Sequence, residues 1–154
     1  MDCSLNFLSR LQWRLRNHFF QDPVLKGLVD DSYFWSGQKI RAKICLSVGK
    51  SFGLEEDLLL DIAAFTEFLH NASLIHDDLI DNDEERRGCQ TPWKRYGRDK
   101  ALLLGDLLIA KSFGASADIN IDPIVRGAWS SEISNCVISA VRGAITELDF
   151  ASTS

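Results

Sequence analysis

The chain has 154 residues, of which 45% are hydrophobic and 25% charged, a composition typical of an ordinary globular protein. At this length we expect a single domain over residues 1–154, and two packed domains are excluded. The 17 basic and 22 acidic residues give a formal net charge of −5, so no overall positive field attracts nucleic acid. Any anionic ligand must therefore bind at a local cluster of basic side chains.

Neither a membrane span nor a secretory signal is expected. Asp61 and Asp106 interrupt the two longest apolar runs, which leaves neither long enough to cross a bilayer. The four cysteines are widely spaced and form no CxxC pair, which favours a reducing, cytoplasmic location. Arg10, Arg14 and Arg16 lie in a nearly acid-free start of the chain, so organellar import is not excluded.

The first two predicted elements are a helix and an irregular segment. Apolar residues recur at helical spacing over the first twenty positions, which favours a packed amphipathic helix over an import sequence; they are Leu5, Leu8, Leu11, Leu15 and Phe19. Asp22-Pro23 should end this helix. The following segment to Ser36, which contains Tyr33 and Trp35, is predicted to be irregular.

Four more helices follow in the predicted order. One covers about residues 37–52, with an apolar side made of Ile40, Ile44, Cys45, Val48 and Phe52. The next covers about 55–81, with an apolar stripe of Leu58, Ile62, Phe65, Leu69, Ala72, Ile75 and Leu79. A loop is predicted over residues 86–99 and a helix over 102–113. A last helix is predicted to begin at Pro123 and to end near Phe150. The fold class is therefore all-α, with five helices and no lasting period-two pattern.

The most informative segment is the end of the predicted helix 55–81. At 100° per residue, Asp81 lies about 40° from Asp77 and about 60° from Asp78, so three carboxylates are expected over one sector. Carboxylate clusters suit Mg²⁺ shared with a phosphate-bearing substrate. Considered alone, a DDxxD match is more often an acidic, solvated helix end.

Neighbouring residues shift the interpretation toward a metal-diphosphate site. His70 lies seven residues before Asp77, about 20° away on the same helix face. Arg41, Arg86 and Arg87 supply fixed cations of the kind that diphosphate oxygens require. His70 considered alone would more often be a core histidine.

The order of motifs resembles the trans-isoprenyl diphosphate synthase (polyprenyl synthetase) family. The matching segments are SGQKIRAKICLSVGKSFGL, FTEFLHNASLIHDDLIDNDEERRG, TPWKRYG and ALLLGDLLIAKSF, which follow the family's order and spacing over about residues 36–115. The resemblance implies the N-terminal portion of the antiparallel helical bundle of isoprenoid synthases. It also implies Mg²⁺-dependent head-to-tail condensation of an allylic prenyl diphosphate with isopentenyl diphosphate.

The resemblance assigns roles to individual positions. It implies that Asp77, Asp78 and Asp81 hold Mg²⁺ on the allylic diphosphate and that Arg86 contacts the same diphosphate. Isopentenyl diphosphate would bind at Arg41, His70 and Arg87, together with the basic block that contains Gln38 and Lys39. Metal ions and arginines would stabilise the departing anionic group.

Two small residues bear on product length. Ala72 and Ser73 lie about one turn before the carboxylates, where bulky side chains in the family stop elongation early, so the resemblance implies a longer product. Close helix packing explains the same small residues equally well. Gly105-Asp106 matches a family block but is expected to be a helix-packing contact and a buried polar partner.

Two departures from the family pattern are visible. Gln38 stands where the family has a lysine, and Lys39 points about 100° away from it on a helix, so it replaces that charge only if the helix start is reshaped. No second DDxxD motif occurs, and family members are roughly twice as long.

Three hypotheses therefore stay open. The chain is synthase-like and completed by a missing C-terminal half or partner, or it is a non-catalytic prenyl-diphosphate-binding regulatory subunit, or it is a related terpene cyclase. Helices without partners would expose apolar faces, which favours a homodimer or a hetero-oligomer with a synthase subunit.

Overall fold

The computed structural model describes residues 3–20 and 32–152. They fall into two compact units, one up to residue 118 and one from residue 119 onward. The elements of the first unit are α1 (Cys3–Phe20), α3 (Ser32–Trp35), α4 (Ile40–Ser51), α5 (Glu56–Asp81), β1 (Glu85–Arg86), β2 (Cys89–Gln90), α6 (Pro92–Tyr96) and α7 (Arg98–Ala117). The second unit contains α8 (Pro123–Ser152). The single-domain interpretation stays a prediction.

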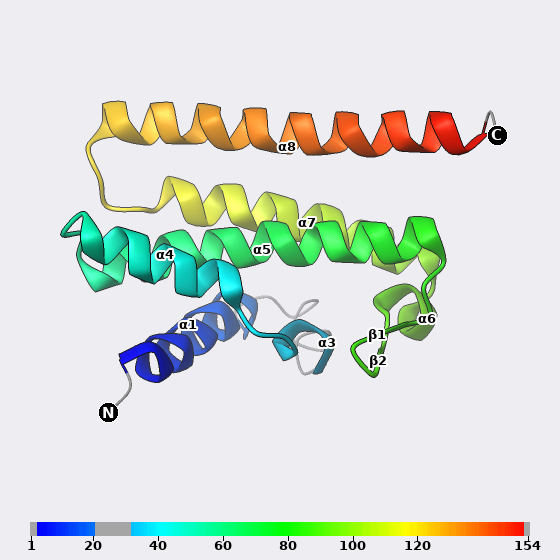
Figure 1. Ribbon diagram of the computed structural model, residues 1–154, viewed down its shortest axis with the longest axis horizontal. Helices are drawn as coiled ribbons and strands as arrows, with labels where there is room; N and C mark the ends of the chain where they lie inside the picture. The colour runs from blue at the N-terminus through cyan, green and yellow to red at the C-terminus, as the bar shows by residue number, and fades with distance from the viewer. Residues whose placement is uncertain (1–2, 21–31, 153–154) are drawn as a thin grey trace. The chain divides into compact units, whose positions relative to one another are not determined.

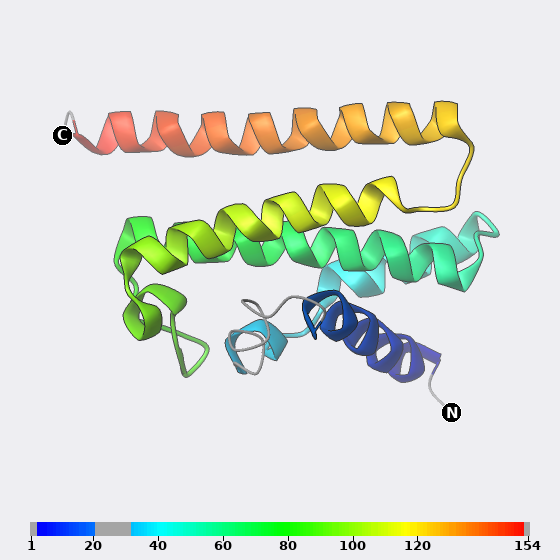
Figure 2. The same cartoon turned by 180° about the vertical axis from the view of Figure 1, so that it is seen from behind.

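Helix α5 is the centre of the first unit. It packs against α4, α7 and α1, and α4, α5 and α7 run antiparallel to their chain neighbours (Figures 1 and 2). Its buried residues occupy more than one side, from Leu59 and Leu60 near the start to Ile75 and Leu79 near the end. The predicted helix 55–81 and the all-α antiparallel bundle are confirmed.

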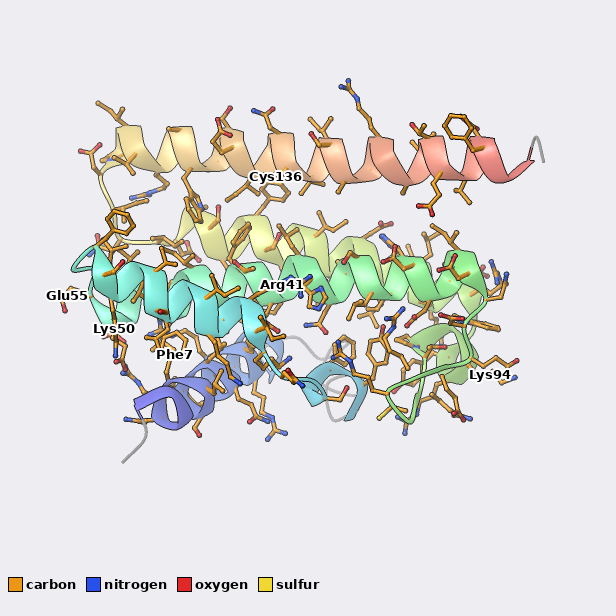
Figure 3. The ribbon with its side chains drawn as sticks, viewed as in Figure 1. Phe7, Arg41, Lys50, Glu55, Lys94 and Cys136 are labelled. Carbon is orange, nitrogen blue, oxygen red and sulfur yellow. The ribbon has the colours of Figure 1, made fainter. Side chains whose placement is uncertain are left out.

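Helix α1 packs one apolar face against the bundle. Phe7, Leu11 and Leu15 are buried. The helical spacing predicted Leu11 and Leu15 but not Phe7, which Figure 3 shows pointing from α1 toward the other helices. Arg10 and Arg14 form ion pairs with acidic residues in the first turns of α5. The predicted packed first helix is confirmed, whereas the predicted break at Asp22-Pro23 lies outside the described residues.

The predicted apolar side of α4 is wrong. Ile40, Ile44, Val48 and Phe52 are each at least half exposed, although they recur at helical spacing. The side that packs on α5 instead carries Ala42, Leu46 and Gly49. A Cβ on Gly49 would lie 2.0 Å from Leu59 Cδ2, so this packing depends on a residue without a side chain.

The connection between α5 and α7 is more ordered than the predicted loop. Asn82 ends α5 in the left-handed conformation, which asparagine tolerates. A two-residue hairpin turn of Arg87 and Gly88, both with positive φ, then joins β1 and β2, as in a type I′ turn. Thr91 Oγ1 and Trp93 Nε1 both donate to the carbonyl of Asp83, at 2.7 and 2.8 Å.

The remaining elements follow the predicted order. The segment before Ser36, predicted to be irregular, contains the short helix α3. Helix α7 covers and extends the predicted 102–113. Helix α8 begins at Pro123, as predicted, and the Asp122 carboxylate accepts the backbone N–H of Ile124 at 2.9 Å as a cap. Within residues 3–20 and 32–152, the five long helices α1, α4, α5, α7 and α8 match the five predicted.

Within the described residues, α5 is the one helix long and apolar enough, by length and composition alone, to cross a membrane. Half of that apolar window is buried inside the protein, which is also typical of the core helix of a soluble protein.

Candidate diphosphate and metal site

The start of α4 is reshaped relative to an ordinary helix start. Lys39, the residue before the helix, has φ 49° and ψ 43°, a left-handed conformation that a non-glycine residue rarely adopts. Gly37 also has a positive φ of 107°, which favours glycine. These two turns carry the chain from α3 into α4 and place Gln38 between them.

The hairpin tip reaches this turn. Arg87 Nη1 donates to the backbone carbonyl of Ser36 at 3.1 Å. The Arg87 guanidinium lies so close to Gly37 that an added Cβ would be 2.1 Å from Nη1. Two segments 51 residues apart in sequence thereby meet. Each has a non-glycine residue with positive φ, Lys39 or Arg87, a feature that often marks functional sites.

A pocket of about 390 Å³ lies between the start of α4, the middle of α5 and the hairpin tip. Its lining consists of Ser36, Gly37, Gln38, Lys39, Ile40, Arg41, Glu67, His70, Asn71, Leu74 and Arg87. All five residues predicted to bind isopentenyl diphosphate are thus brought together: Gln38, Lys39, Arg41, His70 and Arg87. Figure 3 shows Arg41 beside α5.

Arg41 and His70 form a hydrogen-bonded pair in this pocket. Arg41 Nη1 lies 3.1 Å from His70 Nε2, and because the guanidinium can only donate, the imidazole accepts. Burial, followed by the charge of Arg41, lowers the pKa of His70 below its ordinary value of 6.5. His70 is therefore neutral near pH 7 and orients Arg41 without adding charge.

Lys39 is engaged by protein acceptors. Its Nζ donates to the buried Glu67 carboxylate and to the Phe34 carbonyl, both at 3.1 Å, and its side chain is 18% exposed. The helix start is reshaped, as replacement of the missing charge at Gln38 would require. The charge of Lys39 is nevertheless balanced by Glu67. Among the residues that the structure describes, Arg41 and Arg87 are the pocket cations with no acidic side chain at ion-pair distance.

The prediction that three carboxylates project over one sector is wrong for Asp78. Asp78 is fully buried, where Arg86 Nε and Nη2 both lie 2.6 Å from its Oδ1 and Tyr33 Oη donates to its Oδ2 at 2.6 Å. The side chain of Asp78 lies toward α3 and the hairpin, which carry these two partners. The hydrogen bond to Asp78 raises the pKa of Arg86, which stays charged.

Asp77 and Asp81 remain at the surface, one turn apart on α5. Burial, followed by the charge of Asp81, raises the pKa of Asp77. Within 3–20 and 32–152 no group of three or more acidic, histidine or cysteine residues is placed to hold a metal ion. Mg²⁺ in phosphate-transferring sites needs only one or two carboxylates beside substrate oxygens, so Asp77 and Asp81 fit it as a pair. Both oxygens of Asp78 already have protein partners, Arg86 and Tyr33.

The small residues near this site lie in different environments. Ala72 is buried in the core and Ser73 is exposed, with its Oγ donating to the His70 carbonyl, and their role in product length stays a prediction. An added Cβ on Gly105 would lie 2.1 Å from His76 Nε2, which confirms a helix-packing contact. The expectation that Asp106 is a buried partner is wrong, because its side chain is 61% exposed, 3.6 Å from His76.

Two site residues were missed from the sequence. Glu67 is an acid within the apolar run of α5, and that isolated charge is a signal that it has a buried partner. Tyr33 has no comparable signal, because its contact with Asp78 depends on where α3 lies.

The antiparallel helical bundle holds a basic pocket, and α5, which lines that pocket, also carries the carboxylate pair Asp77 and Asp81. This architecture is suited to binding phosphorylated ligands. A family model described as polyprenyl synthetase matches residues 22–153. The chain therefore belongs to the polyprenyl synthetase family.

Curated relatives support the same assignment. The chain is 38% identical over 116 residues to a short chain isoprenyl diphosphate synthase of Methanocaldococcus jannaschii, covering 74% of this chain and 35% of the relative. It is 36% identical over 123 residues to a farnesyl diphosphate synthase of Buchnera aphidicola, covering 77% and 42%. The chain thus spans less than half the length of these relatives.

Solved structures share the fold. A geranylgeranyl pyrophosphate synthetase of the archaeon Geoglobus acetivorans superimposes with a TM-score of 0.82 at 22% identity, covering 92% of this chain and 47% of that one. A geranyltranstransferase of Thermotoga maritima gives 0.65 at 36% identity, covering 72% and 43%. The all-α isoprenoid synthase fold is thereby confirmed.

Proposed function

We propose that this chain provides the diphosphate-binding part of a polyprenyl diphosphate synthase, with isopentenyl diphosphate bound in the pocket of Arg41, His70 and Arg87. The observation that carries the proposal is the convergence of these three side chains from α4, α5 and the hairpin on one pocket. Arginine guanidinium groups bind phosphate oxygens through paired N–H donors. A neutral His70 offers a further donor or acceptor.

The allylic diphosphate would bind farther along α5. Asp77 lies one turn beyond Leu74, which lines the pocket, so both diphosphates would lie along the same helix. Asp77 and Asp81 would hold Mg²⁺, which supplies charge neutralisation for a leaving diphosphate. Asp78 would hold Arg86 charged and oriented beside that site, and Tyr33 would fix Asp78.

Calorimetric titration of the purified chain tests the binding half of the proposal. Isopentenyl diphosphate should bind with a dissociation constant that rises about tenfold or more in Arg41→Gln and in Arg87→Gln, because each removes a charged hydrogen-bond donor. Lys100→Gln, on an exposed residue outside the pocket, is the control with the same change of charge. Equal affinities in all four proteins would refute the assignment of the pocket.

Condensation is proposed to require, in addition, the part of the fold that the relatives carry beyond the matched region, in the same chain or from a partner subunit. A non-catalytic prenyl-diphosphate-binding subunit is the second candidate, because Gln38 replaces a family lysine and Lys39 is paired with Glu67. Incubation with Mg²⁺, farnesyl diphosphate and labelled isopentenyl diphosphate, with the part of a relative's chain beyond the matched region added, separates the two. Labelled product that disappears in Asp77→Asn/Asp81→Asn supports a synthase, and binding without product supports the subunit.

A further inference from the structure

Glu67 is a carboxylate inside a pocket that otherwise suits anions. It is 1% exposed and lines the pocket beside three cationic side chains, on Lys39, Arg41 and Arg87. A buried acid is costly unless it is paired, and an acid beside a phosphate site repels the ligand. Its presence therefore needs a reason beyond packing.

The geometry around Lys39 gives that reason. Lys39 Nζ contacts one Glu67 oxygen and the Phe34 carbonyl, each at 3.1 Å. The Phe34 carbonyl is a neutral acceptor that keeps the Lys39 ammonium in place. The Glu67 carboxylate, in contrast, cancels the charge of the ammonium. The position of Lys39 and its charge are thus controlled by different partners.

We propose that Glu67 sets the charge of this pocket and so determines how strongly it prefers highly charged anions. With Glu67 ionised, Lys39 is neutralised and the pocket presents Arg41 and Arg87 to a phosphate-bearing ligand. Without that charge the pocket presents a third cation. Glu67 acts on the ligand through the field of the pocket and is a specificity-determining residue, and this inference rests on the proposed function of the pocket.

Two opposite substitutions separate this role from a structural one. Glu67→Gln keeps an acceptor for Lys39 and removes one negative charge, so affinity for inorganic pyrophosphate should rise about tenfold at low salt. Lys39→Met leaves Glu67 uncompensated, so affinity should fall by a similar factor. If the pair served the fold alone, both substitutions would weaken binding.

Calorimetry with inorganic pyrophosphate and with inorganic phosphate measures the effect. The gain in Glu67→Gln should be larger for pyrophosphate than for the less charged phosphate and should shrink as salt is raised. Glu84→Gln is the matched control, because Glu84 pairs with Lys94 at 2.7 Å outside the pocket, and it should leave both affinities unchanged. Melting temperatures of all variants verify that they fold.

The outcomes distinguish this inference from the proposed function. Unchanged or weaker pyrophosphate binding in Glu67→Gln, together with clear weakening in Arg41→Gln, overturns the charge-setting role and leaves the pocket assignment intact. Binding that is insensitive to Arg41→Gln overturns the pocket assignment itself. A rise in Glu67→Gln with a fall in Lys39→Met supports both.

Discussion

The phenol of Tyr33 donates a 2.6 Å hydrogen bond to Oδ2 of Asp78, a fully buried carboxylate. This contact joins α3 to the end of α5 and completes the surroundings of an acid that Arg86 already binds. Burial, followed by the hydrogen bond to Asp78, raises the pKa of Tyr33, so the phenol stays a donor through the physiological range. The middle aspartate of the motif is thus a structural centre between the hairpin and α3.

Tyr33→Phe removes this donor without changing the shape of the ring. The free energy of unfolding should fall by about 1 to 3 kcal/mol, because one oxygen of a buried carboxylate loses its partner. Urea denaturation followed by circular dichroism measures the change. Ser51→Ala, which removes an exposed hydroxyl that donates to the neutral Val48 carbonyl, is the control, and an equal loss in both variants would contradict the importance of the Asp78 contact.

The close approach of α4 and α5 at Gly49 predicts a difference between two glycines. In Gly49→Ala the new methyl group meets the buried Leu59 side chain, so stability should fall by about 1 to 2 kcal/mol despite the better helix propensity of alanine. In Gly114→Ala, on α7, an added Cβ meets nothing within 4 Å, so stability should rise by about 0.5 to 1 kcal/mol. Thermal unfolding measures both variants. A stability change of the same sign in the two would be inconsistent with this packing.

The reversed face of α4 predicts which of its apolar residues matter for stability. Leu46→Ala should cost about 2 to 5 kcal/mol, because it empties a buried site. Ile44→Gln should stay within about 0.5 kcal/mol of the unaltered chain, since Ile44 is 56% exposed. Chemical denaturation measures the free energy of unfolding of both variants. A larger loss of stability in Ile44→Gln than in Leu46→Ala would support the face that periodicity alone predicted.

The sequence predicts much of this architecture because long amphipathic helices leave a strong periodic signal. It fails at α4, where isoleucine, valine and phenylalanine outweigh alanine, leucine and glycine in any hydrophobic pattern, although Ala42, Leu46 and Gly49 make the contact. It fails at Asp78 for a different reason. Helix geometry fixes the angle between Asp77 and Asp78, but only the positions of Tyr33 and Arg86 decide which of them faces inward.

The pocket is a contrasting case. Its residues come from three segments, and spacing alone does not bring Arg41 or Arg87 to His70. Resemblance to a known family grouped them correctly. The pairing of Lys39 with Glu67 was not predictable in the same way, because it depends on a left-handed turn at Lys39.

The half-buried His70 predicts a pH dependence of stability. Burial and the charge of Arg41 lower its pKa in the folded state, so the unfolded chain binds the proton more readily and stability rises with pH. The contribution of neutral His70 to stability is complete above pH 6.5, the ordinary pKa of histidine. It is lost as the pH falls from 6.5 through the lower pKa of the folded state. Unfolding measured from pH 5 to 7.5 should therefore depend less steeply on pH in His70→Gln, and an unchanged slope would contradict a neutral His70.

The central claim is that the pocket between α4, α5 and the hairpin binds a diphosphate, and amide chemical shifts test it most directly. At 17.3 kDa the chain suits two-dimensional NMR, in which each backbone amide is followed during titration with isopentenyl diphosphate. The largest saturable changes are predicted at Gly37–Arg41, His70 and Arg87, and they should be lost in Arg41→Gln. Changes that centre elsewhere, or none at millimolar ligand, would contradict the account.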